Sequence, residues 1–434
     1  MAESLWKRFA ALPLEIDRYE LERLEKPVTR GFTRVTTVVH LQGGDQEGVG
    51  EDVTWYAEHH DREQAAGAVL PLAGTWTLES FSVELGMPDT HHRWAYESAA
   101  LDLALRQAGQ TLADAVGREP RPVAFVISPG LGTPPSSAVV RRWLELEPSH
   151  RFKLDVAAEW TDELIAALAE TRAVVTADYK AYYSAEDVAP PDADLYRRVA
   201  EGFPEAYLED PALTDETDPV LEPHRERVTW DAPIHSVEDV EGLAFPPRTL
   251  NSKPSRFGRL EELFAFYAYC EEHGIGLYGG GMFELGPGRG QIQYLASLFH
   301  PDGPNDVAPR EYNDPEPRPG LRKGPLEPAP EKEPPRGINF ICLNANISRQ
   351  FEFLQNAWIA TTKFSGLTGE SDPLLGNRES VLGCPITGNF TMPGNGRLRR
   401  RVSGLPQFVT VRGGAYFFLP SLRALRYFAG TQNP

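Results

Sequence analysis

The chain reads AVVTADY at residues 173–179, AYLEDP at 206–211, RVTWDAP at 227–233 and TLNSKP at 249–254. Each stretch is a short apolar run, typical of a buried strand, with a charged residue near its end. Similar runs stand at 122–128, 151–156 and 275–280, and the segments between them are helical in pattern. Repeated strand–helix units predict an α/β fold with a parallel sheet, which seven or eight units close most simply into a TIM-like barrel.

Charged residues follow four successive predicted strands. Asp178, Glu209 and Asp231 end three of them, and Lys253 ends the next, just before a proline. Active sites of such barrels lie at these strand ends, where three carboxylates repel one another unless a hard cation such as Mg²⁺ binds them. The ion can stabilise an enediolate formed when a substrate carboxylate loses its α-proton. A lysine beside that ion is expected to have a lowered pKa and to act as a base.

Several stretches resemble the enolase superfamily, in particular its mandelate racemase and muconate-lactonizing branch. They are TADYKAYY, YLEDPAL, TWDAPI, LNSKPSRFG and GGGMFELGPGRGQIQYLASL, and the resemblance covers about residues 20–315. It implies an α+β capping domain over 1–118 and a (β/α)7β barrel catalytic domain over 119–315. It also implies that Asp178, Glu209 and Asp231 are metal ligands and that Lys253 is an acid/base.

The second predicted barrel strand departs from that family. Many members carry Lys-x-Lys there, and the second lysine is the opposing acid/base; here RFKLDV (151–156) supplies Lys153 and then Asp155. Two-base racemisation is therefore in question, while a one-base elimination or proton transfer with a different partner stays open. Lys153 remains a candidate for binding the substrate carboxylate.

Three further residues are candidates for substrate binding. Arg30 and Phe32 in VTRGFTR (28–34) fall where the cap loop of this family meets substrate, and an ordinary exposed loop is the alternative. Glu284 follows the seventh strand and is placed to line the site.

The C-terminal part of the chain differs from the rest. A proline-rich segment, 316–335, reads as a linker, and residues 336–434 carry 11 Lys and Arg against 4 Asp and Glu. RGINFICLNANISRQFEFLQNAW and FVTVRGGAYFFLPSLRALR resemble the C-terminal end of dye-decolourising (DyP-type) peroxidases, which implies a partial ferredoxin-like α+β appendage. No histidine follows His300 and the tail has no Gly-x-x-Asp-Gly motif, so haem binding is not expected and no cofactor-binding residue is assigned.

Composition limits the class of protein. The net charge of −19 argues against nucleic acid as the partner, and no apolar run is long enough to cross a membrane. Three scattered cysteines and an N-terminus unlike a signal peptide favour a cytoplasmic location. The expected partner is a small carboxylate substrate, with a homo-oligomer possible by the family resemblance.

The leading interpretation is a Mg²⁺-dependent enzyme of lyase, cycloisomerase or racemase type. Two alternatives stay open: a DyP-type peroxidase-related protein whose haem ligands come from elsewhere, and a catalytically silent metal-binding barrel.

Overall fold

The computed structural model of this chain describes residues 5–28, 32–183 and 190–307, and short stretches between 342 and 425. The chain forms two compact units, residues 1–334 and 335–434. Within the described residues, no helix combines the length and apolar character needed to cross a membrane.

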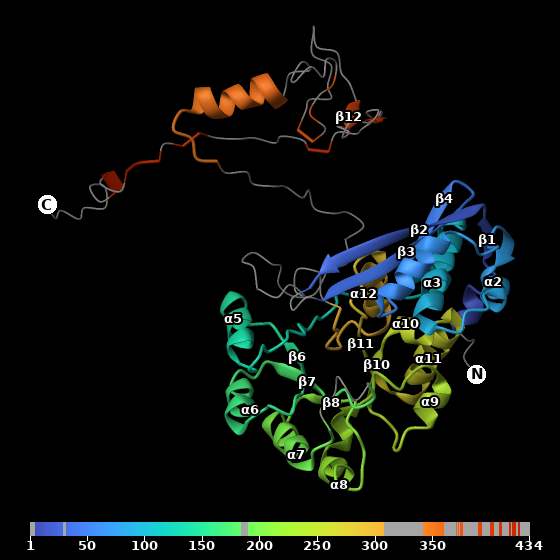
Figure 1. Cartoon of the computed structure of the whole chain (residues 1–434), viewed down its shortest axis with the longest axis vertical. Helices are drawn as coiled ribbons and strands as arrows, with labels where there is room; N and C mark the ends of the chain where they lie inside the picture. The colour runs from blue at the N-terminus through green and yellow to red at the C-terminus, as the bar shows by residue number, and fades with distance from the viewer. Residues whose placement is uncertain are drawn as a thin grey trace. The chain divides into compact units, whose positions relative to one another are not determined.

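The strand–helix repeats form a parallel sheet with helices outside it (Figure 1). Its strands are β6 (Phe152–Asp155), β7 (Val174–Asp178), β8 (Tyr207–Glu209), β9 (Val228–Thr229), β10 (Thr249–Ser252) and β11 (Gly276–Gly279). The helices are α5 (Ala138–Leu146), α6 (Asp162–Ala169), α7 (Ala193–Gly202), α8 (Asp218–Leu221), α9 (Val237–Glu241), α10 (Pro254–Phe257), α11 (Leu260–His273) and α12 (Pro287–Phe299), with a 3₁₀ turn η2 at Glu222–Arg227.

Backbone hydrogen bonds close these strands into a ring. β6 to β9 pair in order, and Asn251 N donates to Trp230 O at 3.1 Å, which joins β9 to β10. β10 pairs with β11, and bridges from Gly280 to Asp306, from Asn305 to Phe125 and from Ile127 to Phe152 of β6 complete the circuit. The predicted barrel is thereby confirmed, with residues 125–127 and 305–306 acting as its remaining strand positions.

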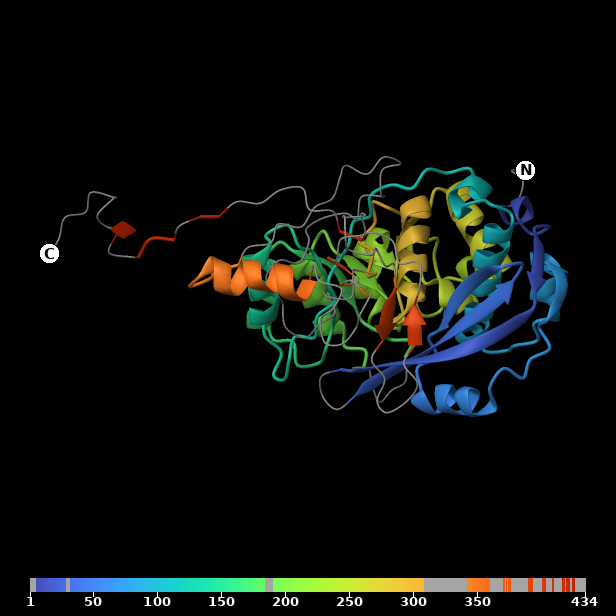
Figure 2. The same cartoon turned by 90° about the horizontal axis from the view of Figure 1, so that it is seen from above.

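The first part of the chain forms the α+β cap seen beside the barrel in Figures 1 and 2. Its strands are β1 (Pro13–Ile16), β2 (Arg18–Pro27), β3 (Thr33–Gly43), β4 (Gln46–Asp52) and β5 (Gly74–Thr77). Its helices are the 3₁₀ turn η1 (Leu5–Arg8), α1 (Ala57–Ala66), α2 (Leu78–Glu84), α3 (Thr90–Gln107) and α4 (Leu112–Val116).

Two cap helices replace one continuous pattern. The apolar residues over 96–116 recur with the spacing of a single helix, but α3 ends at Gln107 and α4 begins at Leu112. Gly109 has a φ of 63°, which glycine adopts without strain. Thr111 then caps α4 through a hydrogen bond from Asp114 N to its side chain, so local backbone chemistry overrides the continuous apolar pattern.

Two buried charged residues tie the cap to the barrel. Arg34 on β3 donates to the carbonyls of Val53 at 2.7 Å and of Met282 at 3.0 Å. Glu51 on β4 accepts hydrogen bonds from the backbone N–H groups of Leu285 and Gly288 at 2.6 and 2.9 Å. Both contacts fix the loop after β11 beneath the cap sheet.

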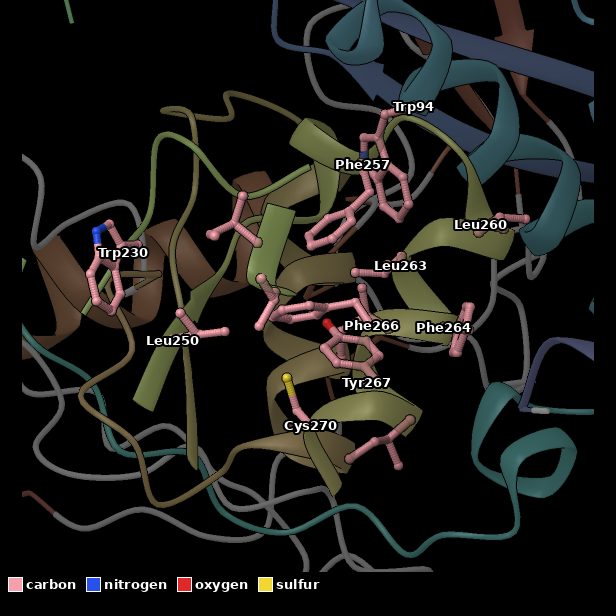
Figure 3. Close-up of a cluster of buried hydrophobic side chains, with 14 of the residues drawn as sticks. Trp94, Trp230, Leu250, Phe257, Leu260, Leu263, Phe264, Phe266, Tyr267 and Cys270 are labelled. Carbon is pink, nitrogen blue, oxygen red and sulfur yellow. The ribbon is translucent and has the colours of Figure 1, made fainter. Parts of the chain in front are cut away.

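The hydrophobic core runs from the cap into the barrel. Figure 3 shows Trp94 of α3 above Phe257, with Leu263, Phe266 and further α11 side chains facing the same interior. These side chains are at most 4% exposed. Burial of this continuous surface stabilises the cap and the barrel together.

The second unit is described only in short stretches. They include two π-helical turns, η4 (Ser348–Glu352) and η5 (Gln355–Ile359), and an antiparallel pair, β12 (Phe390–Met392) with β13 (Arg400–Val402). Phe351 and Tyr416 contact each other edge to face, with ring centroids 6.1 Å apart. The predicted linker, 316–335, lies outside the described residues.

Candidate active site

The three predicted carboxylates lie on adjacent strands. Asp178 and Glu209 end β7 and β8 and are paired in register, and Asp231 follows two residues after the end of β9. Each is at most 1% exposed. The parallel register of these strands therefore brings three acidic side chains to one end of the barrel.

Lys253 lies beside Asp231. β10 ends at Ser252, and Pro254 opens α10, where a proline fits the first helical turn. The Lys253 Nζ is 2.7 Å from Asp231 Oδ2, and Arg256 Nη2 is 3.2 Å from the same oxygen. Burial alone raises the pKa of Asp231, but Arg256 and Lys253 outweigh it and hold that pKa below its usual range.

The pKa of Lys253 differs from the sequence-based expectation of a lowered value. Burial is the largest single effect and lowers this pKa, but the Asp231 carboxylate and Tyr183 together outweigh it, so the pKa is raised. The carboxylate therefore favours the charged amine, and the protein's own charges do not produce the predicted decrease.

Lys153 on β6 joins the other two carboxylates. Its Nζ donates to Glu209 Oε1 and lies 3.1 Å from Asp178 Oδ2. Burial and the neighbouring Asp178 and Asp231 carboxylates raise the pKa of Glu209 even though Lys153 opposes that change. Gathering these carboxylates in a buried place therefore has a free-energy cost that cations must offset.

Lys180 links Asp155 to the carboxylate group through Asp178. Lys180 Nζ lies 3.2 Å from Asp155 Oδ1 and 3.2 Å from Asp178 Oδ2. Lys180 has a φ of 53°, a left-handed conformation that lysine adopts at some cost. The chain thus places a lysine amine next to the residue that replaces the second lysine of the family motif.

Two further polar residues that the sequence did not predict lie beside Glu209. Tyr278 on β11 donates its hydroxyl to Glu209 Oε2, and Asn251 Nδ2 on β10 is 3.4 Å from the same oxygen. Asn251 precedes Lys253 by two positions, so strand alternation places both on one face, a signal that was available in the sequence. The sequence gives no sign of the Tyr278 contact, because the approach of Tyr278 on β11 to Glu209 on β8 depends on how the barrel closes.

The donor set fits a hard divalent cation. Three carboxylates supply the oxygen ligands that Mg²⁺ prefers. Asp231 Oδ1 is buried and has no hydrogen-bond partner among the described residues. An acceptor without a donor in a dry environment is costly, which favours a cation as its partner.

The three predicted substrate-binding residues differ in where they lie. Arg30 lies outside the described residues. Phe32 is 38% exposed and stacks on Trp55 with ring centroids 5.1 Å apart. Glu284 is buried and accepts a hydrogen bond from Met282 N at 2.6 Å. It also borders a cavity of about 400 Å³ whose other lining residues are 24–26, 283, 285 and 289, a set without the three carboxylates and Lys253.

Known proteins share this architecture and part of the sequence. Residues 7–115 and 119–314 match the N-terminal and C-terminal domains of a family described as a domain of unknown function (DUF8230). The chain is 28% identical over 329 residues to the N-succinylamino acid racemase of Thermus thermophilus, which covers 68% of this chain and 86% of that protein. Residues 7–115 and 119–314 belong to this DUF8230 family, and about 68% of the chain is related to the enolase superfamily.

The relatives that match this region are enzymes of that superfamily, and a solved structure shares its fold. The crystal structure of a dipeptide epimerase from Methylococcus capsulatus, complexed with Mg ion, has a TM-score of 0.54 and 21% identity, covering 68% of this chain and 90% of that one. The capping domain and barrel expected from the sequence are therefore confirmed as a fold.

The C-terminal region of the chain resembles a different group of proteins, the dye-decolourising peroxidases. It is 33% identical over 95 residues to the multifunctional dye peroxidase DyP2 of an Amycolatopsis species, which covers 21% of this chain. The match spans 19% of the peroxidase, so it relates only a part of that fold to the second unit.

Proposed function

We propose that this chain is a Mg²⁺-dependent enzyme that removes the α-proton of a small carboxylate, as a lyase or an isomerase. The observation that supports this most strongly is the Lys253 amine 2.7 Å from Asp231, beside two further buried carboxylates on adjacent strands. An amine and an oxygen-rich cation site at one barrel end are what α-proton abstraction requires.

Each charged side chain has a part in this proposal. Asp178, Glu209 and Asp231 would hold the ion, which, when bound, stabilises the negative charge that develops on the substrate carboxylate. Lys253 would take the α-proton through the Nζ of its neutral form, which an ion bound by Asp231 would favour by offsetting the charge of that carboxylate. Lys153 would position the substrate carboxylate by its charge. Its amine lies next to Asp178 and Glu209, two of the predicted ligands of the ion.

We infer that Lys180 supplies the proton-transfer partner opposite Lys253. Its amine lies 3.2 Å from Asp155, the residue that replaces the usual second lysine. Asp155 would then act as a positioning residue that holds the Lys180 amine at the barrel end. This arrangement favours isomerisation, and an N-acylated amino acid is the substrate class suggested by the racemase relative.

Solvent exchange tests this function. The full chain is incubated in D₂O with Mg²⁺ and a panel of N-acylamino acids and other small carboxylates, and deuterium at the α-carbon is measured by NMR. We expect exchange that stops when a chelator removes the metal and that Asp231→Asn abolishes, because one oxygen ligand and the partner of Lys253 change together. Asp194→Asn, an exposed aspartate of α7, is the matched control and should retain full exchange. Exchange that survives metal removal contradicts the proposal.

A Lys180→Met variant tests whether Lys180 is the proton-transfer partner of Lys253. If Lys180 returns the proton, the variant forms little of the opposite enantiomer from a chiral substrate but still exchanges the proton that Lys253 removes. Equal formation of the opposite enantiomer by Lys180→Met and the unaltered chain contradicts its role.

A catalytically silent barrel is the second candidate, favoured by Asp155 at the position of a catalytic lysine. Mg²⁺ binding with no exchange across the substrate panel would support it. Haem-dependent peroxidase chemistry would instead require a Soret band when haem is added to the full chain, and the absence of histidine after His300 argues against that result.

A further inference from the structure

A second group of metal-ligand side chains lies in the cap. Asp52 ends β4, His59 and Glu63 lie on α1, and His92 lies in the first turn of α3. Each offers a ligand atom, and these atoms all lie within 4.8 Å of one another. His59 and Glu63 are four residues apart, so the helix presents them on one face.

The contacts within this cap cluster are close. His59 Nε2 lies 2.8 Å from Asp52 Oδ2, and His92 Nε2 lies 2.9 Å from Glu63 Oε1. The two imidazole rings stand edge to face with centroids 4.8 Å apart. Ligand atoms in a tetrahedral zinc site are roughly 3.3 Å apart, given metal–ligand distances near 2 Å. The side chains therefore need only small rotations to surround one ion.

Burial and supporting hydrogen bonds fit a built site. The Asp52 side chain is fully buried and that of Glu63 is 10% exposed. Thr54 donates through its backbone N and hydroxyl to Asp52 Oδ1 at 2.8 and 2.7 Å, and Tyr96 donates its hydroxyl to Glu63 Oε1 at 2.9 Å. Ligating carboxylates are oriented by outer hydrogen bonds of this kind.

An unpaired atom provides an independent sign of a ligand. Glu63 Oε2 is buried and has no hydrogen-bond partner among the described residues. Two histidine–carboxylate ion pairs would account for the other contacts but would leave this oxygen unsatisfied, at a free-energy cost. A cation bound by the Glu63 carboxylate removes that cost.

We propose that Asp52, His59, Glu63 and His92 form a zinc site that links β4, α1 and α3 of the cap. Two imidazoles and two carboxylates match the nitrogen and oxygen ligands of four-coordinate Zn²⁺, whereas Mg²⁺ takes oxygen ligands. Four protein ligands leave no open position, so the role is structural. This site shares no residue with the barrel carboxylates, and its test is independent of the proposed catalysis.

Zinc titration of the chelator-treated full chain tests the site, with millimolar Mg²⁺ present to occupy the barrel carboxylates. We expect one Zn²⁺ per chain and a higher Tm with zinc. His59→Gln and His92→Gln should each weaken zinc binding more than about 100-fold, the upper end of what outer-shell changes cost. His40→Gln is the matched control, because His40 also contacts two carboxylates, Glu22 and Glu47, and should bind zinc like the unaltered chain.

Cobalt provides a readout that needs no substitution. Co²⁺ bound by the unaltered chain should give the intense visible absorption of a four-coordinate ion. Weak six-coordinate bands, no zinc binding in the presence of Mg²⁺, or unchanged binding by the His59→Gln and His92→Gln variants would each overturn the proposal.

Discussion

The three buried carboxylates predicted to bind the ion each contact a lysine or arginine side chain. Asp231 faces Lys253 and Arg256, and Glu209 faces Lys153, all within the barrel. The sequence was sufficient to predict that the three carboxylates and Lys253 lie at one end of the barrel, because the C-terminal ends of parallel strands meet there, while their roles remain predictions. It did not predict the Lys180–Asp155 contact, which depends on the left-handed backbone at Lys180.

A substitution of Arg34 measures how much a buried, hydrogen-bonded charge contributes to stability. It is fully buried and donates to backbone carbonyls of Val53, Thr54 and Met282 at 2.7 to 3.0 Å. Arg34→Leu should lower the free energy of unfolding by about 3–5 kcal/mol, since several buried acceptors lose their donor. Urea unfolding followed by tryptophan fluorescence measures this.

The control for Arg34 is an exposed arginine. Arg18, on β2, contacts Glu20 at 3.8 Å with most of its side chain in solvent. Arg18→Leu should change the unfolding free energy by less than about 0.5 kcal/mol. Equal effects of the two substitutions would contradict the structural role of Arg34.

At the scale of elements, close packing of α3 on β4 shapes the cap. A Cβ at Gly50 would lie 1.9 Å from the carbonyl oxygen of Ala95, and one at Gly48 would lie 2.3 Å from that of Ala99. The strands of the barrel were predictable from short apolar runs and their spacing. The close approach of β4 to α3 was not, because a glycine in a strand has several explanations that only packing separates.

Gly50→Ala should therefore destabilise the cap. The added methyl group meets backbone and forces β4 and α3 apart, at a cost of about 3 kcal/mol or more, the upper end for overpacking. Gly290→Ala, in α12, places the new Cβ more than 4 Å from every atom beyond its chain neighbours and the adjacent helix backbone, and should stabilise the chain by up to about 1 kcal/mol through helix propensity. Thermal unfolding compares the two, and a Gly50→Ala variant as stable as the unaltered chain would disagree with this packing.

At the scale of the whole molecule, the chain joins an enolase-superfamily unit to a second unit that resembles part of a peroxidase. The resemblances were visible in sequence because both contain long matching stretches. The division of the first unit at 118/119 and the linker at 316–335 remain predictions. What the second unit does could not be predicted, since it lacks the histidine that would hold haem.

Limited proteolysis tests the independence of the two units. We expect the first cleavage within 315–345, because this proline-rich sequence has little apolar surface to bury. Mass spectrometry of the fragments identifies the cut, and the N-terminal fragment should retain solvent exchange activity. First cleavage within the barrel or the cap would show that the second unit is not a separable appendage.

Lys253 provides the most direct test of the central claim. Deuterium incorporation at the α-carbon is measured in D₂O with Mg²⁺ for the unaltered chain, Lys253→Ala and Lys7→Ala, an exposed lysine of η1. We predict that Lys253→Ala slows exchange by about 10²–10⁴-fold, as expected for loss of a general base, while Lys7→Ala matches the unaltered chain. Exchange that persists unchanged in Lys253→Ala would contradict the account.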